Sequence, residues 1–465
     1  MNKETRIQKI GEILARKSGS HGGIEIPWQD ALKLMTVYKV PLNLLVYNKY
    51  NGRILSRTKS LEKQGQHIHP ETEAGRALIE KLLWDSDQGR NKQTQNSIDA
   101  LGQEKVGIIT RDGIIIDGNR RAMLLRRSKK YDYFKTVVLD VTLEENPNEI
   151  EKLETTYQMG EDEKLTYNPI EKYLKAKFLA QRSVSVADIA KWMGETPSTI
   201  EELLAVMKVM DEYLEYLGCN GIYTQLDGRE DQFITLTKQL KNFYGGQSKR
   251  PFDGYVDADV DDLKLISFDY IRVKYEGKDF RNIAYGNQGN HYFGDKKIWQ
   301  SFRDFHFKRV LPIKEAESDI DFDSENLSAH LNDRDRKFLE SSKNEKGKSF
   351  FDENIKLHWQ QIQYKQQVNE PEKLVSSAID ALDAIDQENK SFAANKVMEK
   401  VEKINGMTIA MLKHSAPDRL LSQVIQMLQS IDCEDSKGAK RKGVLAKIKE
   451  IERLVHRMEK TIKAA

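Results

Sequence analysis

VGIITRDGIIIDGNRRAMLLRR, residues 106–127 of a 465-residue chain, predicts two strands followed by a helix. Its apolar residues at 106–110 and 114–116 predict two short strands, because Val and Ile are enriched in strands. The Asp-Gly dipeptide between them predicts a tight hairpin turn. A second Asp-Gly ends the second strand, and the chain then enters a predicted helix that begins at Asn119 or Arg120.

The junction between the second strand and this helix has the features of an anion-binding site. Gly118 permits a backbone conformation that other residues rarely adopt. The first N–H groups of a helix have no intrahelical partner and lie at the positive end of its dipole. Arg120 and Arg121 add two forked donors at the same place. The junction therefore predicts a phosphate site, although a hairpin leading into an ordinary basic surface helix fits this pattern equally well.

Composition indicates a soluble protein of several domains. A chain of 465 residues is too long for one hydrophobic core. Hydrophobic residues make up 39% of it and charged residues 31%, and no apolar run approaches the roughly 20 residues that span a bilayer. The N-terminal residues lack an apolar signal core, so the sequence predicts a cytoplasmic protein without a membrane partner.

Cysteine usage and net charge limit the kinds of site to expect. Cys219 and Cys433 lie far apart, without the Cys or His spacing of a structural zinc site, so no metal ligands are nominated. The 74 basic and 72 acidic residues give a net charge of +2. Any nucleic-acid surface must therefore be local.

The segments on either side of the hairpin predict one α+β domain over residues 1–145. Residues 24–40 predict a strand that enters a short helix, and residues 41–48 predict another strand. A helix is predicted at 71–84. A strand at 136–142 closes the domain.

DGNRRAML, residues 117–124, resembles the glycine, polar residue, Arg-Arg box of the ParB/sulfiredoxin-like superfamily, in which that box binds nucleotide phosphates. The turn Asn51-Gly52-Arg53-Ile54 resembles an early turn of the family whose arginine reaches the nucleotide. The resemblance implies a ParB/sulfiredoxin-like domain that binds a nucleoside triphosphate, CTP or ATP, together with Mg²⁺. It also implies the following nucleotide-binding residues: Arg53, Gly118, Asn119, Arg120 and Arg121.

A second part of the resemblance lies in residues 146–218, which predict a helical domain like a helix-turn-helix. Asn168-Pro169-Ile170-Glu171 is similar to the start of a family helix, with Pro in the first turn. Ala190 and Gly194 fit the small residue and the turn glycine of a helix-turn-helix, and Thr196 or Ser198 fits the cap of its second helix. The resemblance implies DNA contacts at the start of that helix. The candidates are Ser198 and Thr199.

Two departures from the family pattern limit what the resemblance implies. The Glu-Asn-x-x-Arg signature is absent, and only Glu154, Gln158 and Lys164 lie in its neighbourhood, which leaves nucleotide hydrolysis without its usual residues. The second helix begins with acidic residues at 195, 201 and 202 and no Arg or Lys, and carboxylates repel DNA phosphates. A packing module without DNA contact therefore stays open as an alternative.

The C-terminal half contains no recognised motif. Residues 219–325 predict a mixed α/β region of unknown role, in which residues 263–274 alternate like a strand. Residues 326–465 predict an α-helical domain that forms a bundle or coiled coil and a homodimer. Its last helix has apolar residues at alternating spacings of four and three, which is a coiled-coil seam: Val444, Ile448, Ile451, Val455, Met458 and Ile462.

The first functional hypothesis is a nucleotide-binding switch that gates association with DNA or a partner protein, in DNA segregation or in defence against foreign DNA. The alternative is an enzyme on the same scaffold, either an NTPase (CTPase-like), a metal-dependent nuclease or a phosphoryl-transfer enzyme. Asp117 and Glu154 are the carboxylates nominated for catalysis in that case. A scaffold protein with a vestigial nucleotide site is a third hypothesis.

Overall fold

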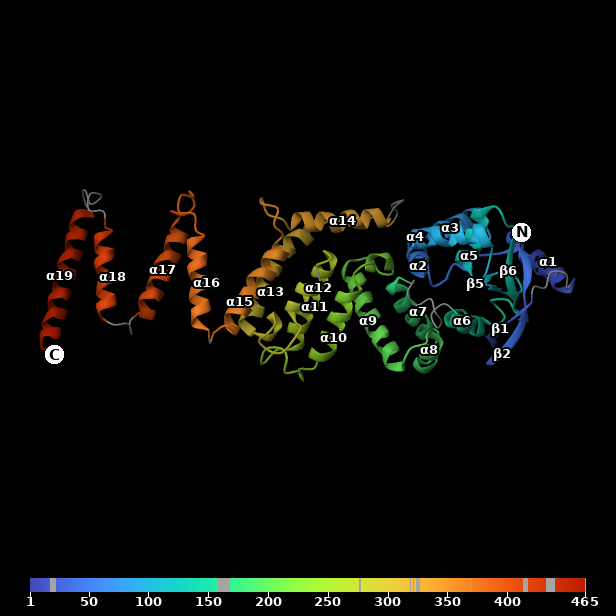
Figure 1. Ribbon diagram of the computed structural model, residues 1–465, viewed down its shortest axis with the longest axis horizontal. Coiled ribbons are helices and arrows are strands. Elements are labelled where there is room, and N and C mark those ends of the chain that lie inside the picture. Colours follow the sequence, from blue (N-terminus) through green and yellow to red (C-terminus); the bar gives the residue numbers. More distant parts are fainter. Residues whose placement is uncertain are drawn as a thin grey trace. The chain divides into compact units, whose positions relative to one another are not determined.

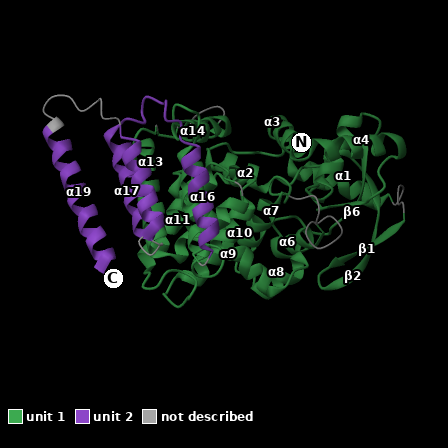
Figure 2. Cartoon of the chain, turned by 60° about the vertical axis from the view of Figure 1, so that its left-hand side comes forward, with its two compact units in different colours: residues 1–369 green, residues 370–465 purple. Residues whose placement is uncertain are grey.

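A computed structural model describes residues 1–16, 22–157, 168–275, 277–317, 319–320, 322, 327–368, 370–412, 417–431 and 440–464. The described residues form two compact units, Met1–Asn369 and Glu370–Ala465 (Figure 2). Gln158, Lys164 and Cys433 lie outside the described residues. The division into four domains stays a prediction.

The N-terminal part of the first unit contains both strands and helices (Figure 1). Its elements are α1 (Lys3–Ala15), β1 (Gly23–Trp28), β2 (Ala31–Thr36), β3 (Tyr38–Pro41), α2 (Leu55–Lys63), α3 (Glu73–Ser86), α4 (Gln88–Leu101), β4 (Gly107–Ile109), β5 (Ile115–Asp117), α5 (Asn119–Ser128), β6 (Tyr133–Val138) and α6 (Pro147–Thr155). The predicted hairpin, the helix after it and the helix at 71–84 are confirmed as β4, β5, α5 and α3. The strand predicted at 136–142 is confirmed but begins and ends earlier, as β6.

Within the described residues, the larger sheet has the strand order β3-β6-β4-β5. β4 runs parallel to β6, while the β3–β6 and β4–β5 pairs are antiparallel. Alternate residues of a strand point to opposite faces, and the sheet is apolar on both. Ile108 and Val137 pack with the β1–β2 hairpin and α6, whereas Ile109 and Val138 pack with α5 and its neighbouring helices. The sheet thus has a core on each face, and the β5–α5 junction lies at its edge.

Two of the predicted elements near the N-terminus are wrong. Residues 24–40 form β1, β2 and β3 instead of a strand and a helix, because Gln29 and Asp30 both take positive φ and turn the chain into a hairpin. Residues 41–48 are not a strand. The short 3-10 helix Leu42–Leu44 occupies this segment, and Val46 makes only an isolated bridge to Ile114.

The rest of the first unit is helical. Its helices are α7 (Pro169–Gln181), α8 (Val186–Met193), α9 (Pro197–Tyr216), α10 (Glu230–Phe243), α11 (Asp257–Arg272), α12 (Gly277–Phe280), α13 (Lys296–Glu315), α14 (Leu327–Ser341) and α15 (Phe350–Gln366). The strand predicted at 263–274 is wrong, since most of it lies in α11, and the described residues between 219 and 317 contain no strand. α11 buries consecutive residues 266–272, so it lacks the one-sided apolar stripe by which a surface helix is recognised.

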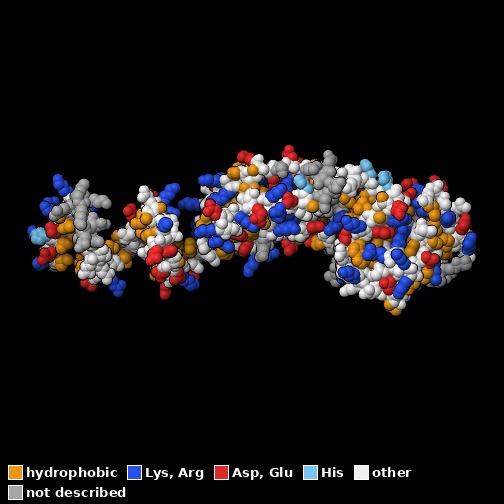
Figure 3. Space-filling model, turned by 90° about the horizontal axis from the view of Figure 1, so that it is seen from above, with side chains coloured by type: hydrophobic (Ala, Val, Ile, Leu, Met, Phe, Trp, Pro, Cys, Tyr) orange, Lys and Arg blue, Asp and Glu red, His pale blue; other side chains and the backbone are white. Residues whose placement is uncertain are grey.

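The second unit contains α16 (Pro371–Asp383), α17 (Asn395–Leu412), α18 (Pro417–Gln429) and α19 (Lys440–Ala464). The predicted helical character of this region is confirmed. None of the described side chains on α16, α17 or α18 is buried. Hydrophobic side chains are instead visible among charged ones on the surface of this unit (Figure 3). The exposed apolar residues include Val375, Ile379, Met407, Val424, Ile425, Ile448, Val455 and Ile462.

Candidate functional site

The β5–α5 junction has the predicted geometry. Gly118 is the N-cap of α5, with φ 98° and ψ 17° in the left-handed region, and none of the described side chains caps the helix. A Cβ atom at this position would lie 2.7 Å from the ring of Phe134 and 3.2 Å from Nη2 of Arg121. Both the backbone conformation and the close packing therefore require glycine.

A cavity of about 230 Å³ lies against this junction. Three parts of the chain form its wall: the turn at 51–53, the end of α4 with the loop at 102–105, and the β5–α5 junction. Four cationic and two acidic side chains line it, so the lining favours an anion. The complete lining is Asn51, Arg53, Thr94, Ser97, Ile98, Gly102, Gln103, Glu104, Lys105, Asp117, Gly118, Arg120 and Arg121.

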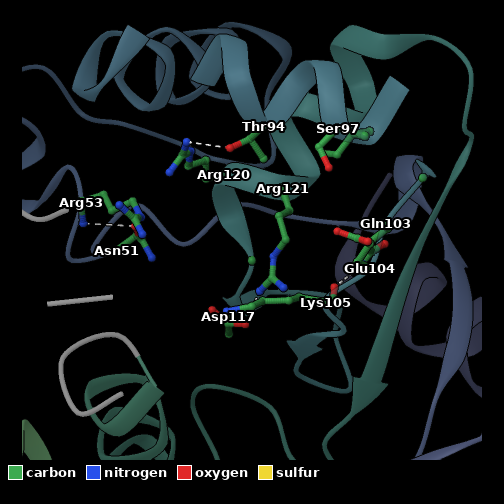
Figure 4. Close-up of a pocket in the computed structure, with 13 residues that line it drawn as sticks. Asn51, Arg53, Thr94, Ser97, Gln103, Glu104, Lys105, Asp117, Arg120 and Arg121 are labelled. Atoms are coloured by element: carbon green, nitrogen blue, oxygen red, sulfur yellow. Dashed lines mark hydrogen bonds and ion pairs between the residues drawn. The ribbon is translucent and has the colours of Figure 1, made fainter. Parts of the chain in front are cut away.

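Arg120 is held in the cavity wall by α4. Its Nε donates to Oδ1 of Asn91 at 2.6 Å. Its Nη2 donates to Oγ1 of Thr94 at 3.0 Å (Figure 4). Asn91 is itself buried, and its amide donates to the carbonyl groups of Leu83 and Trp84. The guanidinium of Arg120 is thus preorganised, which lowers the entropy lost when an anion binds.

Arg121 leaves the start of α5 in another direction. Its Nη2 donates to Oδ2 of Asp117 at 2.5 Å, and its Nη1 donates to the carbonyl of Val106 at 3.4 Å. In Figure 4 its side chain extends toward Asp117 and Lys105, away from Arg120. The two guanidinium groups therefore contact different parts of the cavity, and a ligand at Arg121 competes with the carboxylate of Asp117.

Arg53 reaches the same cavity from a distant part of the sequence. Asn51 shapes its turn by accepting a hydrogen bond from the backbone N–H of Arg53 at 3.2 Å. The structure thus brings Arg53 together with Gly118, Arg120 and Arg121, as the resemblance implies. The sequence prediction missed other cavity residues. Lys105 and Gln103 follow the Gly102 turn, and Thr94 lies on α4. The order of helix, glycine turn and strand before the box is the sequence feature that could have identified this segment.

Asn119 and Glu154 lie outside the cavity lining. Asn119 is 2% exposed; its Oδ1 accepts from the backbone N–H of Asn48 and its amide donates to the carbonyl of Ile115. Glu154 is 3% exposed, and its Oε1 accepts from Nδ2 of Asn48 at 2.9 Å. Asp117 lines the cavity, so the structure does not place the two nominated carboxylates at one site.

Ser198 and Thr199 lie in the first turn of α9. Gly194, with φ 63°, ends α8, and Thr196 caps α9 by accepting from the N–H of Thr199 at 3.1 Å. Ser198 is exposed, and so are the nearby acidic residues at 201 and 202. The surface at the start of α9 is therefore polar and acidic.

The described residues contain no group of three or more His, Cys, Asp or Glu side chains that could hold a metal ion. Among the described helices, none combines the length and apolar character that a membrane crossing requires.

Two crystal structures of one protein match part of this chain. A crystal structure of the C-terminally truncated chromosome-partitioning protein ParB from Caulobacter crescentus, complexed to the centromeric parS site, matches with 11% identity and a TM-score of 0.29. The match covers 53% of this chain and 97% of that one. This chain is similar to ParB over about half its length.

A second crystal structure of the Caulobacter crescentus ParB protein, complexed with CTP-γ-S, matches with 13% identity and a TM-score of 0.17, covering 43% of this chain and 92% of that one. No protein-family model and no curated protein matches the chain. These identities and TM-scores do not identify a ligand for the site. The ligand is therefore inferred from the geometry of the cavity.

Proposed function

We propose that this chain is a ParB-like, nucleotide-binding switch, in which CTP or ATP with Mg²⁺ binds at the β5–α5 junction. The observation that supports this most strongly is the convergence of Arg53, Arg120 and Arg121 on one cavity at the N-terminus of α5, which no described side chain caps. Helix N-termini and guanidinium groups both favour phosphate oxygens. In the sequence Arg53 is far from the box, so chance clustering of basic residues within one segment does not explain the arrangement.

The size and charge of the cavity indicate which part of the nucleotide it holds. At about 230 Å³ it is smaller than the roughly 300 Å³ at which sites for drug-sized ligands begin. It therefore suits the phosphate chain, with the nucleoside extending beyond it. The carboxylates of Asp117 and Glu104 offer oxygen ligands of the kind that Mg²⁺ takes together with phosphates.

Nucleotide binding would then gate association with DNA or with a partner protein. A ligand shifts a conformational equilibrium only by its difference in affinity for the two states. The nucleotide-bound state would present the α8–α9 helix pair to its target, with Ser198 and Thr199 at the contact. The acidic start of α9 weakens phosphate contacts, so a protein partner is the competing target.

The second unit would supply the homodimer contact. Its helices expose large apolar residues along their length in the single chain. Exposed apolar stripes on amphipathic helices are buried in bundles and coiled coils. DNA segregation and defence against foreign DNA are the two processes in which such a dimeric switch would act.

Isothermal titration of the full chain with CTP, ATP, GTP and UTP, each with and without Mg²⁺, tests the proposal. Binding of at least one triphosphate with a Kd in the micromolar range is the expected result. Absence of binding by all of them would remove the proposed function. Incubation with supercoiled plasmid and Mg²⁺ or Mn²⁺ tests the enzyme alternative, for which Asp117 at the cavity is the favourable observation; metal-dependent cleavage would favour a nuclease.

A further inference from the structure

The first wall of the cavity is connected to α7 by buried polar groups. Asn119, the first residue of α5, accepts from the N–H of Asn48 at 3.0 Å. The side chain of Asn48 donates to Oε1 of Glu154 at 2.9 Å, and Oε2 of Glu154 lies 3.6 Å from Nζ of Lys175 on α7. Lys175 is 1% exposed and also pairs with Glu151 on α6. A continuous set of contacts therefore joins the start of α5 to α7.

The second wall is connected to the same helix. Arg53 lies two residues before α2, whose second residue is Ser56. The backbone N–H and the hydroxyl of Ser56 donate to the two carboxylate oxygens of Glu171 on α7, at 2.9 and 2.6 Å. Glu171 is completely buried, and the guanidinium of Arg57 lies 3.6 Å from it. The turn that carries Arg53 is thus attached to α7 through Ser56, three residues further along the chain.

Glu171 and Lys175 are four residues apart, so they lie on one face of α7. Charged groups in such positions seldom add stability over well-packed apolar residues, because their desolvation offsets their attraction. Their hydrogen bonds do, however, specify where α2 and α6 sit on the helix. One helix face therefore sets the separation of the two cavity walls.

We propose that Glu171 and Lys175 are positioning residues of the nucleotide site, which hold Arg53 and the start of α5 at the separation that a phosphate chain needs. This inference rests on the proposed function. Neither residue touches the cavity, so each acts through its contacts with α2 and α6. The same contacts work in reverse, since linkage is reciprocal: a ligand that fixes both walls also fixes α7.

The test compares Glu171→Ala with Asn354→Ala in the full chain. Asn354 is an equally buried polar residue on α15, and its amide donates to the carbonyl of Phe302, away from the cavity. Both variants lose a buried hydrogen-bonding group, so both are expected to have lower Tm. E171A is expected to bind the best triphosphate at least about tenfold more weakly than N354A does. Nucleotide is also expected to slow amide hydrogen exchange in α7 of the wild-type chain and of N354A, but not in E171A.

The outcomes separate this inference from the proposed function. Equal affinities of E171A and N354A, with wild-type binding intact, would overturn the positioning role alone. Absence of triphosphate binding by the wild-type chain would overturn both. If E171A does not fold, Ser56→Ala replaces it, because this variant keeps the backbone donor and removes only the hydroxyl. A loss of about threefold relative to N354A is then expected, and no loss would overturn the inference.

Discussion

Nη2 of Arg121 lies 2.5 Å from Oδ2 of Asp117. One of the cationic side chains of the proposed phosphate site therefore already forms an ion pair with a carboxylate of the same cavity. A phosphate that binds Arg121 must compete with this carboxylate. Asp117→Asn removes one negative charge from the cavity and releases the guanidinium. We expect D117N to bind a triphosphate about fivefold more tightly, roughly 1 kcal/mol, when titrated in EDTA.

EDTA is needed because Asp117 is also a candidate ligand of Mg²⁺. With Mg²⁺ present, D117N would change metal binding as well as the charge near Arg121. The matched control is Asp140→Asn, which removes an equal charge from an exposed position outside the cavity lining. Tighter binding by both variants would mean that only the overall charge matters. Weaker binding by D117N in EDTA would contradict the competition between Asp117 and phosphate.

The Arg120→Ala, Arg121→Ala double variant is expected to weaken nucleotide binding by more than about a hundredfold, since charge-assisted bonds to phosphate are lost at two positions. The chain should still fold, but with lower stability. Loss of Arg120 leaves the buried Oδ1 of Asn91 without its donor, at a cost of roughly 1–3 kcal/mol. Titration and thermal melting measure the two effects, and Arg111→Ala with Lys130→Ala removes the same charge at the surface. Equal losses in both double variants would argue against a specific site.

Glu171 predicts a pH dependence of stability. Burial raises its pKa to about 7, although hydrogen bonds from Ser56 and the charge of Arg57 oppose the shift. Between pH 4.5 and about 7, Glu171 therefore carries a proton in the folded state. In the unfolded chain, where its pKa is near 4.5, it has released that proton. The stabilisation from this group is fully present below pH 4.5 and is lost as the pH rises to about 7.

Urea unfolding of the wild-type chain and of Glu171→Gln at pH 5, 6, 7 and 8 measures this effect. Gln keeps the size of the side chain but does not titrate. Relative to E171Q, the wild-type chain should lose up to roughly 3 kcal/mol of unfolding free energy across this range. A difference between the two proteins that does not change with pH would show that Glu171 does not titrate in this window.

Lys175→Met should be among the most destabilising single changes in the first unit. Burial lowers the pKa of Lys175, but the carboxylates of Glu154 and Glu151 outweigh it, so the pKa lies above its ordinary value and the ammonium is charged. K175M removes the buried ammonium that contacts Glu151 and Glu154, at an expected cost of about 3–5 kcal/mol in urea unfolding. Adding Glu154→Gln should recover at least about half of this loss. Without such recovery, the loss would come from packing instead of charge.

Deletion of residues 370–465 should convert a dimer into a monomer. The apolar residues of the second unit are exposed in the single chain, and pairing with a second copy would bury them. Light scattering at micromolar concentration measures the mass. Ile448→Asp, on the apolar stripe of α19, should also weaken the dimer, whereas Ala446→Asp, on another face, should not. A full-length chain that is monomeric at these concentrations would contradict the prediction.

Several elements were predictable because neighbouring residues encode them. The β4–β5 hairpin, the positive φ of Gly118 and the start of α5 follow from residues within one short segment. The resemblance placed Arg53 with the box, and the structure brings it there. The prediction of a strand at 263–274 was wrong because α11 is buried on most of its faces. Its apolar residues therefore do not recur with the period of about 3.6 residues that marks a surface helix.

The sequence by itself determined the junction of strand, glycine and arginine-rich helix and the helical C-terminal region, because each depends on local backbone preference and on the spacing of apolar residues. Only the tertiary structure decided that Asp117 lines a cavity with Arg53 while Glu154 is buried against Lys175. It also placed Ser56 against Glu171, residues 115 positions apart. The physical reason is that burial and pairing of charged groups depend on which distant segments pack together, and local sequence does not encode that.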